Sequence, residues 1–91
     1  MAHEIFISHS SKDVAAAGIV CAALEARGIR CWIAPRDVLP GVSYGEAIID
    51  AINQCRFFVL IFSAHSNKSQ QVLREVERAA SKNIAIVPFR L

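Results

Sequence analysis

The sequence predicts a single α/β domain in which helices cover both faces of a parallel sheet. Four short apolar segments, rich in β-branched and aromatic residues, alternate with three segments of helical periodicity. Strands that are joined through helices run parallel, and right-handed crossovers place helices on both sides of the sheet. A chain of 91 residues, 54% hydrophobic and 20% charged, has room for one small domain over residues 1–91. The expected class is an open, doubly wound sheet.

The first strand is expected over residues 4–8, a short apolar run with β-branched side chains. Ser10 followed by Asp13 is typical of a capping box, which predicts a helix over residues 11–27. Gly28 then supplies the left-handed residue at which such a helix ends. At about 100° per residue, one stripe of this helix faces the core. The stripe comprises Val14, Ala17, Val20, Cys21 and Leu24.

The second strand is expected over residues 29–33, and an irregular connection follows it over residues 34–42. Within the connection, Pro40-Gly41 fits the two central positions of a type II turn. Val38-Leu39 forms an apolar tip beside this turn. Such a tip is equally typical of a recognition loop and of a loop folded back onto its own core, and both interpretations stay open.

The second helix is expected to begin with a capping box made by Ser43 and Glu46 and to end near Cys55. Its inward-facing residues are expected to be Ile48, Ile49 and Ile52. Residues 56–63 then carry the most apolar strand, and this continuous pattern predicts burial on both faces of the sheet.

The last two elements follow the same alternation of helix and strand. Asn67 or Ser69 is expected to cap a third helix that runs to about residue 82. Asn83 suits a left-handed ending, and residues 84–88 are expected to form the fourth strand.

Charge and composition exclude several classes of function. Ten basic and eight acidic residues alternate along the chain and give a net charge of +2, so neither nucleic acid nor a membrane is an expected partner. The longest apolar runs are far below the roughly 18–20 residues that span a bilayer, and the N-terminus lacks the pattern of a secretory signal. The three cysteines are widely spaced and are expected as buried thiols, with no metal site, in the cytoplasm.

A binding site is expected at the edge where the strands end, because ligands of doubly wound sheets bind outside the carboxyl ends of the strands. Residues 9–12 lack the glycine-rich patterns of a dinucleotide or triphosphate cradle. Ser10 and Ser11 can still present hydroxyls there, although capping the helix is the main role expected of Ser10. The sequence lacks the Ser or Cys elbow that a catalytic triad with His9 would need, so a hydrogen-bonding or stacking role is expected for this residue. The acidic residues of a phospho-receiver are missing as well.

The third helix carries two candidate carboxylates. Glu75 and Glu77 lie on opposite flanks of the apolar arc, each about 100° from its centre, so helical geometry does not choose between them. Gln71 shares the flank of Glu75, one turn earlier. The simplest interpretation of both acids is a solvated helix face with two ion pairs, Glu75–Arg78 and Arg74–Glu77.

Taken together, these segments resemble the Toll/interleukin receptor (TIR) domain family in its bacterial form. Residues 5–10 resemble the family's first motif, and residues 36–41 (Arg-Asp-Val-Leu-Pro-Gly) fit its RDxxPG loop. The remaining matches are the third strand, the glutamate-bearing helix and the fourth strand, at residues 59–63, 69–75 and 86–89. The family's sheet is flavodoxin-like with five strands, so the resemblance implies the order 2-1-3-4 here. It also implies that the chain is C-terminally incomplete and lacks the fifth strand and last helix.

The resemblance implies an NAD glycohydrolase or cyclase that cleaves the nicotinamide–ribose bond, in a bacterial immune or signalling protein. Enzymes of the family use a glutamate of the third helix within a WxxxE-like pattern, and that position matches Glu75 as the catalytic residue. Gln71 stands where the pattern has tryptophan. NAD is then the substrate, with no cofactor and no metal. Its pocket is expected to be lined by His9, Ser10, Ser11, Pro35, Arg36, Asp37 and Gln71.

The resemblance also implies self-association and contact with other TIR domains. The loop that would make this contact contains Arg36, Asp37, Pro40 and Gly41. An alternative function from a different class is a TIR scaffold that oligomerises without catalysis. Gln71 favours the scaffold, whereas Glu75 and the polar residues at the sheet's edge favour the enzyme.

Overall fold

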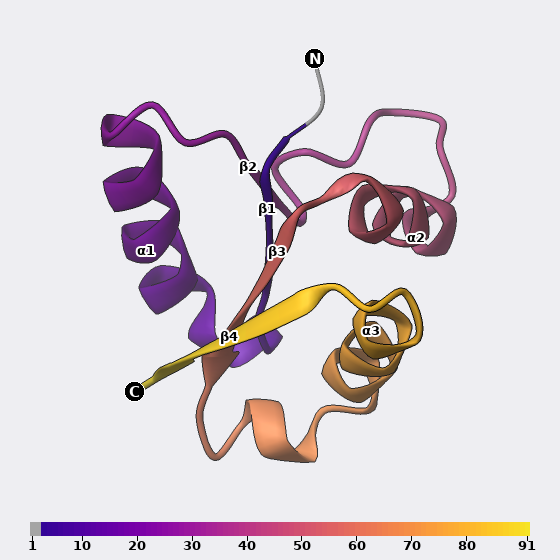
Figure 1. The fold of residues 1–91 in the computed structure, drawn as a ribbon. Coiled ribbons are helices and arrows are strands. Elements are labelled where there is room, and N and C mark those ends of the chain that lie inside the picture. Colours follow the sequence, from indigo (N-terminus) through magenta and orange to yellow (C-terminus); the bar gives the residue numbers. More distant parts are fainter. Residues whose placement is uncertain (1–2) are drawn as a thin grey trace.

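Four parallel strands form the sheet around which the protein is built (Figure 1). The computed structural model describes residues 3–91. The strands lie in the order β2-β1-β3-β4, which confirms the order and the flavodoxin-like class implied by the sequence. Their bounds are Ile5–Ser8 for β1, Cys31–Ile33 for β2, Phe57–Phe62 for β3 and Ala85–Arg90 for β4.

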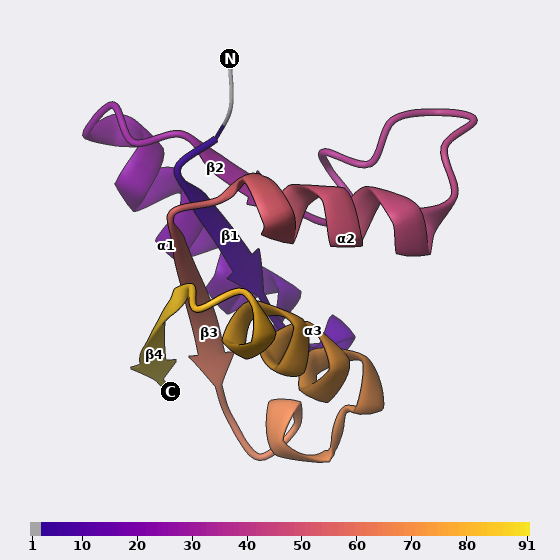
Figure 2. The same ribbon diagram turned by 45° about the vertical axis from the view of Figure 1, so that its right-hand side comes forward.

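Three helices cover the sheet on both faces, as predicted. Figure 1 shows α1 on one side of the sheet and α2 with α3 on the other, and Figure 2 shows α2 and α3 side by side. Single 3₁₀ turns precede α1 and α3. The bounds are Ser11–Asp13 for η1, Val14–Ala26 for α1, Tyr44–Gln54 for α2, Ser66–Lys68 for η2 and Gln70–Ser81 for α3.

The alternation of side chains along the strands builds two core layers. Ile5 and Ile7 of β1 point toward α1, where they pack with Ala17 and Cys21. The intervening Phe6 points to the other face, toward α2 and α3. There it forms a row of stacked rings across the sheet, 5.4 Å from Phe58 and 5.3 Å from Trp32 between ring centroids.

Several residues expected in the core are exposed instead. Val14, the first residue of α1, is 50% exposed. Ile49 is 45% exposed because α2 turns it toward the space between α2 and α3. Phe57, at the start of β3, is also 45% exposed, so the prediction that this strand is buried on both faces is wrong at its first residue.

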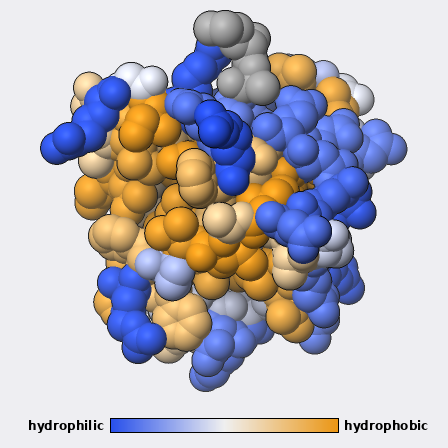
Figure 3. Space-filling model, viewed as in Figure 1, coloured by the Kyte–Doolittle hydropathy of each residue, from blue (hydrophilic) through white to orange (hydrophobic). Residues whose placement is uncertain are grey.

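An apolar area remains uncovered on the face that carries β4. Figure 3, in the same view as Figure 1, shows apolar residues gathered there. Val87 and Phe89 point to the same side of the sheet as Val59 and Ile61, their neighbours on β3, but each is about half exposed. Pro88 is part of this strand, as expected at a sheet edge, where a missing N–H breaks no ladder.

Two of the three predicted side-chain caps at helix starts are confirmed. Ser10 Oγ accepts a hydrogen bond from the Lys12 amide, and Ser69 Oγ accepts one from the Val72 amide, each at 3.2 Å. The capping box predicted for Ser43 is wrong, because its side chain makes no capping hydrogen bond.

Asp13 does not close a capping box on Ser10 as predicted. Its buried carboxylate instead accepts the hydroxyl of Ser63, which follows β3. This long-range bond joins the segments that leave β1 and β3, so it fixes their spacing at the sheet's edge.

Residues with a left-handed backbone conformation occur at the positions that the sequence predicted. Gly28 has φ 80° after α1, and Asn83 has φ 57° after α3. Gly41 has φ 82°, and the Val42 amide donates to the Leu39 carbonyl at 3.3 Å, which confirms the type II turn. Leu39 is 68% exposed at its tip, so the loop is not folded back onto the core at this residue.

Replacing Phe58 by alanine is expected to lower the free energy of unfolding by about 3–5 kcal/mol, because the ring is fully buried in the stacked row. Urea titration followed by circular dichroism measures the change. Leu73→Ala is the matched control, since that side chain is 57% exposed and its loss is expected to cost at most about 0.5 kcal/mol. Equal losses for the two variants would contradict this account of the core.

Candidate functional site

A cleft of about 350 Å³ lies at the carboxyl end of β1. This is the point where the strand order reverses, since β2 lies on one side of β1 and β3 on the other. The cleft is lined by residues from β1, the segments after β1 and β2, and the starts of α2 and α3. They include His9, Ser11, Val14, Pro35, Tyr44, Ser69, Gln71 and Glu75. Its volume is that of an ordinary small-ligand pocket.

Glu75 is the buried acid of this cleft, with only 8% of the residue exposed. Ser8, the last residue of β1, donates its hydroxyl to Oε1 of Glu75 at 2.7 Å. Gln71, one helical turn earlier, donates its side-chain amide to Oε2 at 3.3 Å. The two bonds hold both carboxylate oxygens in fixed positions at the cleft wall.

Burial raises the pKa of Glu75, because it removes the carboxylate from water. The hydrogen bonds from Ser8 and Gln71 oppose this effect, and the nearby His9 opposes it further. The carboxylate thus loses hydration through burial but is stabilised by hydrogen bonds from specific donors. Such a combination is common in functional sites.

The structure separates the two acids that helical geometry left equivalent. Glu77 is exposed, whereas Glu75 turns toward the sheet. The expected ion pairs Glu75–Arg78 and Arg74–Glu77 are not formed, since the salt bridges found within residues 3–91 all involve Arg36. The solvated-face interpretation therefore does not apply to Glu75.

His9 connects the end of β1 to the loop that follows β2. Its Nδ1 lies 2.8 Å from the Ser10 carbonyl oxygen, and its Nε2 lies 3.0 Å from the Ala34 carbonyl oxygen. Both ring nitrogens therefore lie within hydrogen-bonding distance of backbone carbonyl oxygens, and the tautomer decides which nitrogen donates. The ring lines the cleft as a hydrogen-bonded support, as the sequence suggested, rather than as a free base.

The other residues expected in the pocket divide into two groups. Ser11, Pro35 and Gln71 line the cleft together with His9. Ser10 is buried and its hydroxyl caps the helix, so it does not border the cleft.

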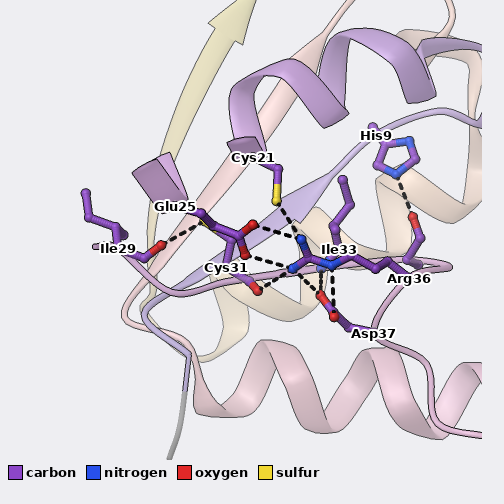
Figure 4. A network of polar contacts seen from close by, with 9 residues as sticks. His9, Cys21, Glu25, Ile29, Cys31, Ile33, Arg36 and Asp37 are labelled. Atoms are coloured by element: carbon purple, nitrogen blue, oxygen red, sulfur yellow. Dashed lines mark hydrogen bonds and ion pairs between the residues drawn. The ribbon is translucent and has the colours of Figure 1, made fainter. Parts of the chain in front are cut away.

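Arg36 and Asp37 also lie away from the cleft, in the polar network of Figure 4. Arg36 forms two hydrogen bonds to Glu25, both of 2.9 Å, and two to Asp37, of 3.0 and 2.8 Å. It also donates to the Cys31 carbonyl at 3.1 Å. Asp37 in turn accepts the Ile33 amide at 2.9 Å. The network fastens the loop after β2 to the last turn of α1, and its residues are not placed to touch a ligand in the cleft.

The cysteines are free and buried, in line with the sequence. Burial raises the pKa of all three thiols, that of Cys31 to about 12. Within residues 3–91 there is no cluster of His, Cys, Asp or Glu that could hold a metal ion. None of the helices in that part of the chain has both the length and the apolar character needed to cross a membrane.

Several residues of the site were not among those expected from the sequence, and Ser8 and Tyr44 are two of them. Ser8 is the acid's direct hydrogen-bond donor, and a polar residue closing an apolar strand at the ligand-binding edge was the signal available for it. Tyr44 lines the cleft from the first turn of α2, and nothing in the local pattern indicated this role.

A model of the TIR domain family matches residues 5–91 of the chain. The stimulator of interferon genes protein of Magallana gigas is 30% identical over 98% of the chain. A metazoan TIR-STING receptor structure from C. gigas is 29% identical over 98% of the chain and 31% of its own, with a TM-score of 0.82. The TIR domain of a Toll-related receptor from Hydra magnipapillata is 23% identical over 96% of the chain and 69% of its own, with a TM-score of 0.86.

The fold, the cleft at the strand reversal and these similarities define the class: the chain belongs to the TIR domain family. It spans 23% of the length of the Magallana relative. The relatives named above are metazoan and give no support to the bacterial form suggested by the motifs.

Replacing Glu75 by glutamine is expected to raise the thermal unfolding midpoint at about pH 7.5 and to leave it nearly unchanged at about pH 4. Burial raises the folded-state pKa of Glu75, so at low pH the side chain is protonated and burial does not destabilise the wild type. As the pH rises through that pKa, the buried carboxylate ionises and destabilises the wild type relative to the neutral glutamine variant. Calorimetry at both pH values measures the difference. Glu77→Gln is the control, because that residue is exposed. An advantage of the glutamine variant that is larger at low pH would contradict the burial argument.

Proposed function

We propose that this TIR domain cleaves the nicotinamide–ribose bond of NAD, with Glu75 as its catalytic carboxylate. The single observation that supports the proposal most is the position of this acid. It is buried at the wall of the cleft, and both of its oxygens are held by donors from β1 and α3.

The chemistry requires only one acid. The nicotinamide of NAD is cationic and leaves as a neutral molecule that takes the electron pair of the C1′–N bond, so the leaving group needs no proton. The ribose carbon develops positive charge, as in glycoside hydrolysis, and an adjacent carboxylate stabilises it. Addition of water at C1′ with loss of a proton gives the linear product, and attack by a nucleophile within the same molecule gives a cyclic one. Glu75 serves either outcome.

The comparisons support a signalling or immune setting for this activity. The relatives include a protein named as a stimulator of interferon genes and a structure described as a TIR-STING receptor. We place the domain in a protein of that kind, with NAD as its substrate and the TIR domain as one part of a larger assembly.

Replacing Glu75 by glutamine is expected to lower NAD turnover by about a hundredfold or more, because the neutral amide cannot stabilise the developing cation. Nicotinamide release by the assembled full-length protein measures the effect. Glu77→Gln is the matched control from the same helix and is expected to keep full turnover. Loss of turnover in the Glu77 variant instead would show that Glu77, and not Glu75, is the catalytic acid.

Self-association is proposed to occur through the loop that contains Arg36, Asp37, Pro40 and Gly41. The type II turn at Pro40-Gly41 holds Leu39 outward, and the bonds of Arg36 fasten the base of the loop to α1. A rigid loop with an apolar tip is suited to packing against a neighbouring copy.

Leu39→Glu is expected to shift the protein toward the monomer, since it places a charge on the apolar tip. Light scattering over a range of protein concentrations measures the change in size. Ile19→Glu is the control, because Ile19 is equally exposed but lies on α1, away from this loop. An undiminished assembly in the Leu39 variant would remove this loop from the interface.

A second candidate function is a scaffold that assembles without catalysis. Gln71 favours it, because an amide stands where the family's NAD-cleaving enzymes have tryptophan beside the acid. The two functions separate in one experiment. Assembly of the wild-type protein without any nicotinamide release would contradict the enzymatic function and support the scaffold function.

A further inference from the structure

A second hollow lies between α2 and α3 and continues from the cleft of Glu75. It has a volume of about 480 Å³, and Ile48, Ile49 and Ile52 of α2 form an apolar wall along it. Tyr44 and Gln71 border both the cleft and the groove, as does Glu75 itself. A ligand held at Glu75 can therefore extend into the groove without leaving the protein surface.

Two arginines of α3 border the same groove. Arg74 and Arg78 are one turn apart and lie on the flank of the helix that faces α2, together with Glu75. Within residues 3–91 neither guanidinium forms an ion pair with an acid. Glu75 is the one acid among the residues that line the groove, and its oxygens are already occupied by Ser8 and Gln71.

Arg78 is held in place by a neutral partner. Its Nε donates to Oδ1 of Asn53 on α2 at 3.1 Å, which fixes the plane of the guanidinium. Its two terminal nitrogens have no acceptor among the described residues. A planar guanidinium with a free pair of donors is well suited to bind two oxygens of a phosphate group.

We infer that Arg74 and Arg78 form a subsite for the diphosphate of the dinucleotide, with the isoleucine wall of the α2–α3 groove receiving its adenosine. This inference rests on the proposed function, because the ribose at Glu75 sets the end from which the ligand enters the groove. Two neighbouring cations repel each other in the empty groove, and a bridging anion of charge −2 relieves that repulsion. The apolar wall suits the flat face of an aromatic base.

The test compares ligands that do and do not carry phosphate. Calorimetric titration of the full-length protein with ADP-ribose is expected to show binding that weakens about tenfold for Arg74→Gln or Arg78→Gln and further for the double variant. The KM for NAD is expected to rise by a similar factor at unchanged kcat, whereas cleavage of nicotinamide riboside, which lacks phosphate, is expected to stay the same.

Arg27→Gln is the matched control, since Arg27 is an exposed arginine that follows α1, outside the groove. Its ADP-ribose affinity is expected to equal that of the wild type. Arg78→Lys is expected to restore part of the affinity, because a point charge attracts phosphate without pairing two oxygens. An unfolded variant is recognised by its thermal midpoint, which surface changes of this kind leave within a few degrees.

The outcomes separate this subsite from the catalytic proposal. Binding of ADP-ribose that depends on both arginines supports the subsite even where the wild type releases no nicotinamide. An ADP-ribose affinity that neither substitution changes, or an equal loss of affinity in the Arg27 variant, overturns the subsite even where NAD is cleaved. Failure of the wild type to bind ADP-ribose overturns it as well.

Discussion

The hydrogen bond between Ser8 and Glu75 is the contact on which the candidate site depends. It joins the last residue of β1 to the second turn of α3, which are 67 residues apart in the chain. A carboxylate buried this far from water is costly unless donors compensate for the lost hydration. Ser8 and Gln71 supply part of that compensation, while burial still raises the pKa, so the site combines a raised pKa with a fixed geometry.

The sheet makes this contact possible. Parallel pairing of β1 with β3 brings Ser8 level with Leu60, and the chain after β3 then returns as α3 across the same edge. Phe6 and Phe58 of the aromatic row belong to the core layer in which residues of α2 and α3 pack against the sheet. The proposed catalytic site and the proposed diphosphate subsite would both rely on this layer, because each uses residues of α3.

Much of the fold was predictable because local signals agree with the final structure. Hydrophobic periodicity placed the four strands and three helices, and Gly28, Asn83 and Ser69 marked the ends of elements through their backbone chemistry. These features depend on a few neighbouring residues. The order of the strands came from the family resemblance rather than from local pattern, and the structure agrees with it.

The details of the site were not predictable, because distant residues decide them. Hydropathy alone would place Leu73 on the core face of α3, but the sheet buries the flank that carries Glu75 and leaves Leu73 57% exposed. Asp13 was expected to cap its own helix, yet its carboxylate accepts a hydrogen bond from the hydroxyl of Ser63, fifty residues later in the chain. Arg36 was expected in the pocket, and Glu25 of α1 draws it elsewhere. In each case a tertiary partner outcompetes the local choice.

The saturation of Arg36 by its own chain affects how a neighbour could recognise the loop after β2. Its guanidinium is already paired with the carboxylates of Glu25 and Asp37 and with a carbonyl oxygen, so an incoming surface meets no free cation there. The proposed association at this loop would then depend mainly on shape and on desolvation of Leu39. Such an interface would respond less to ionic strength than one that is steered by opposite charges.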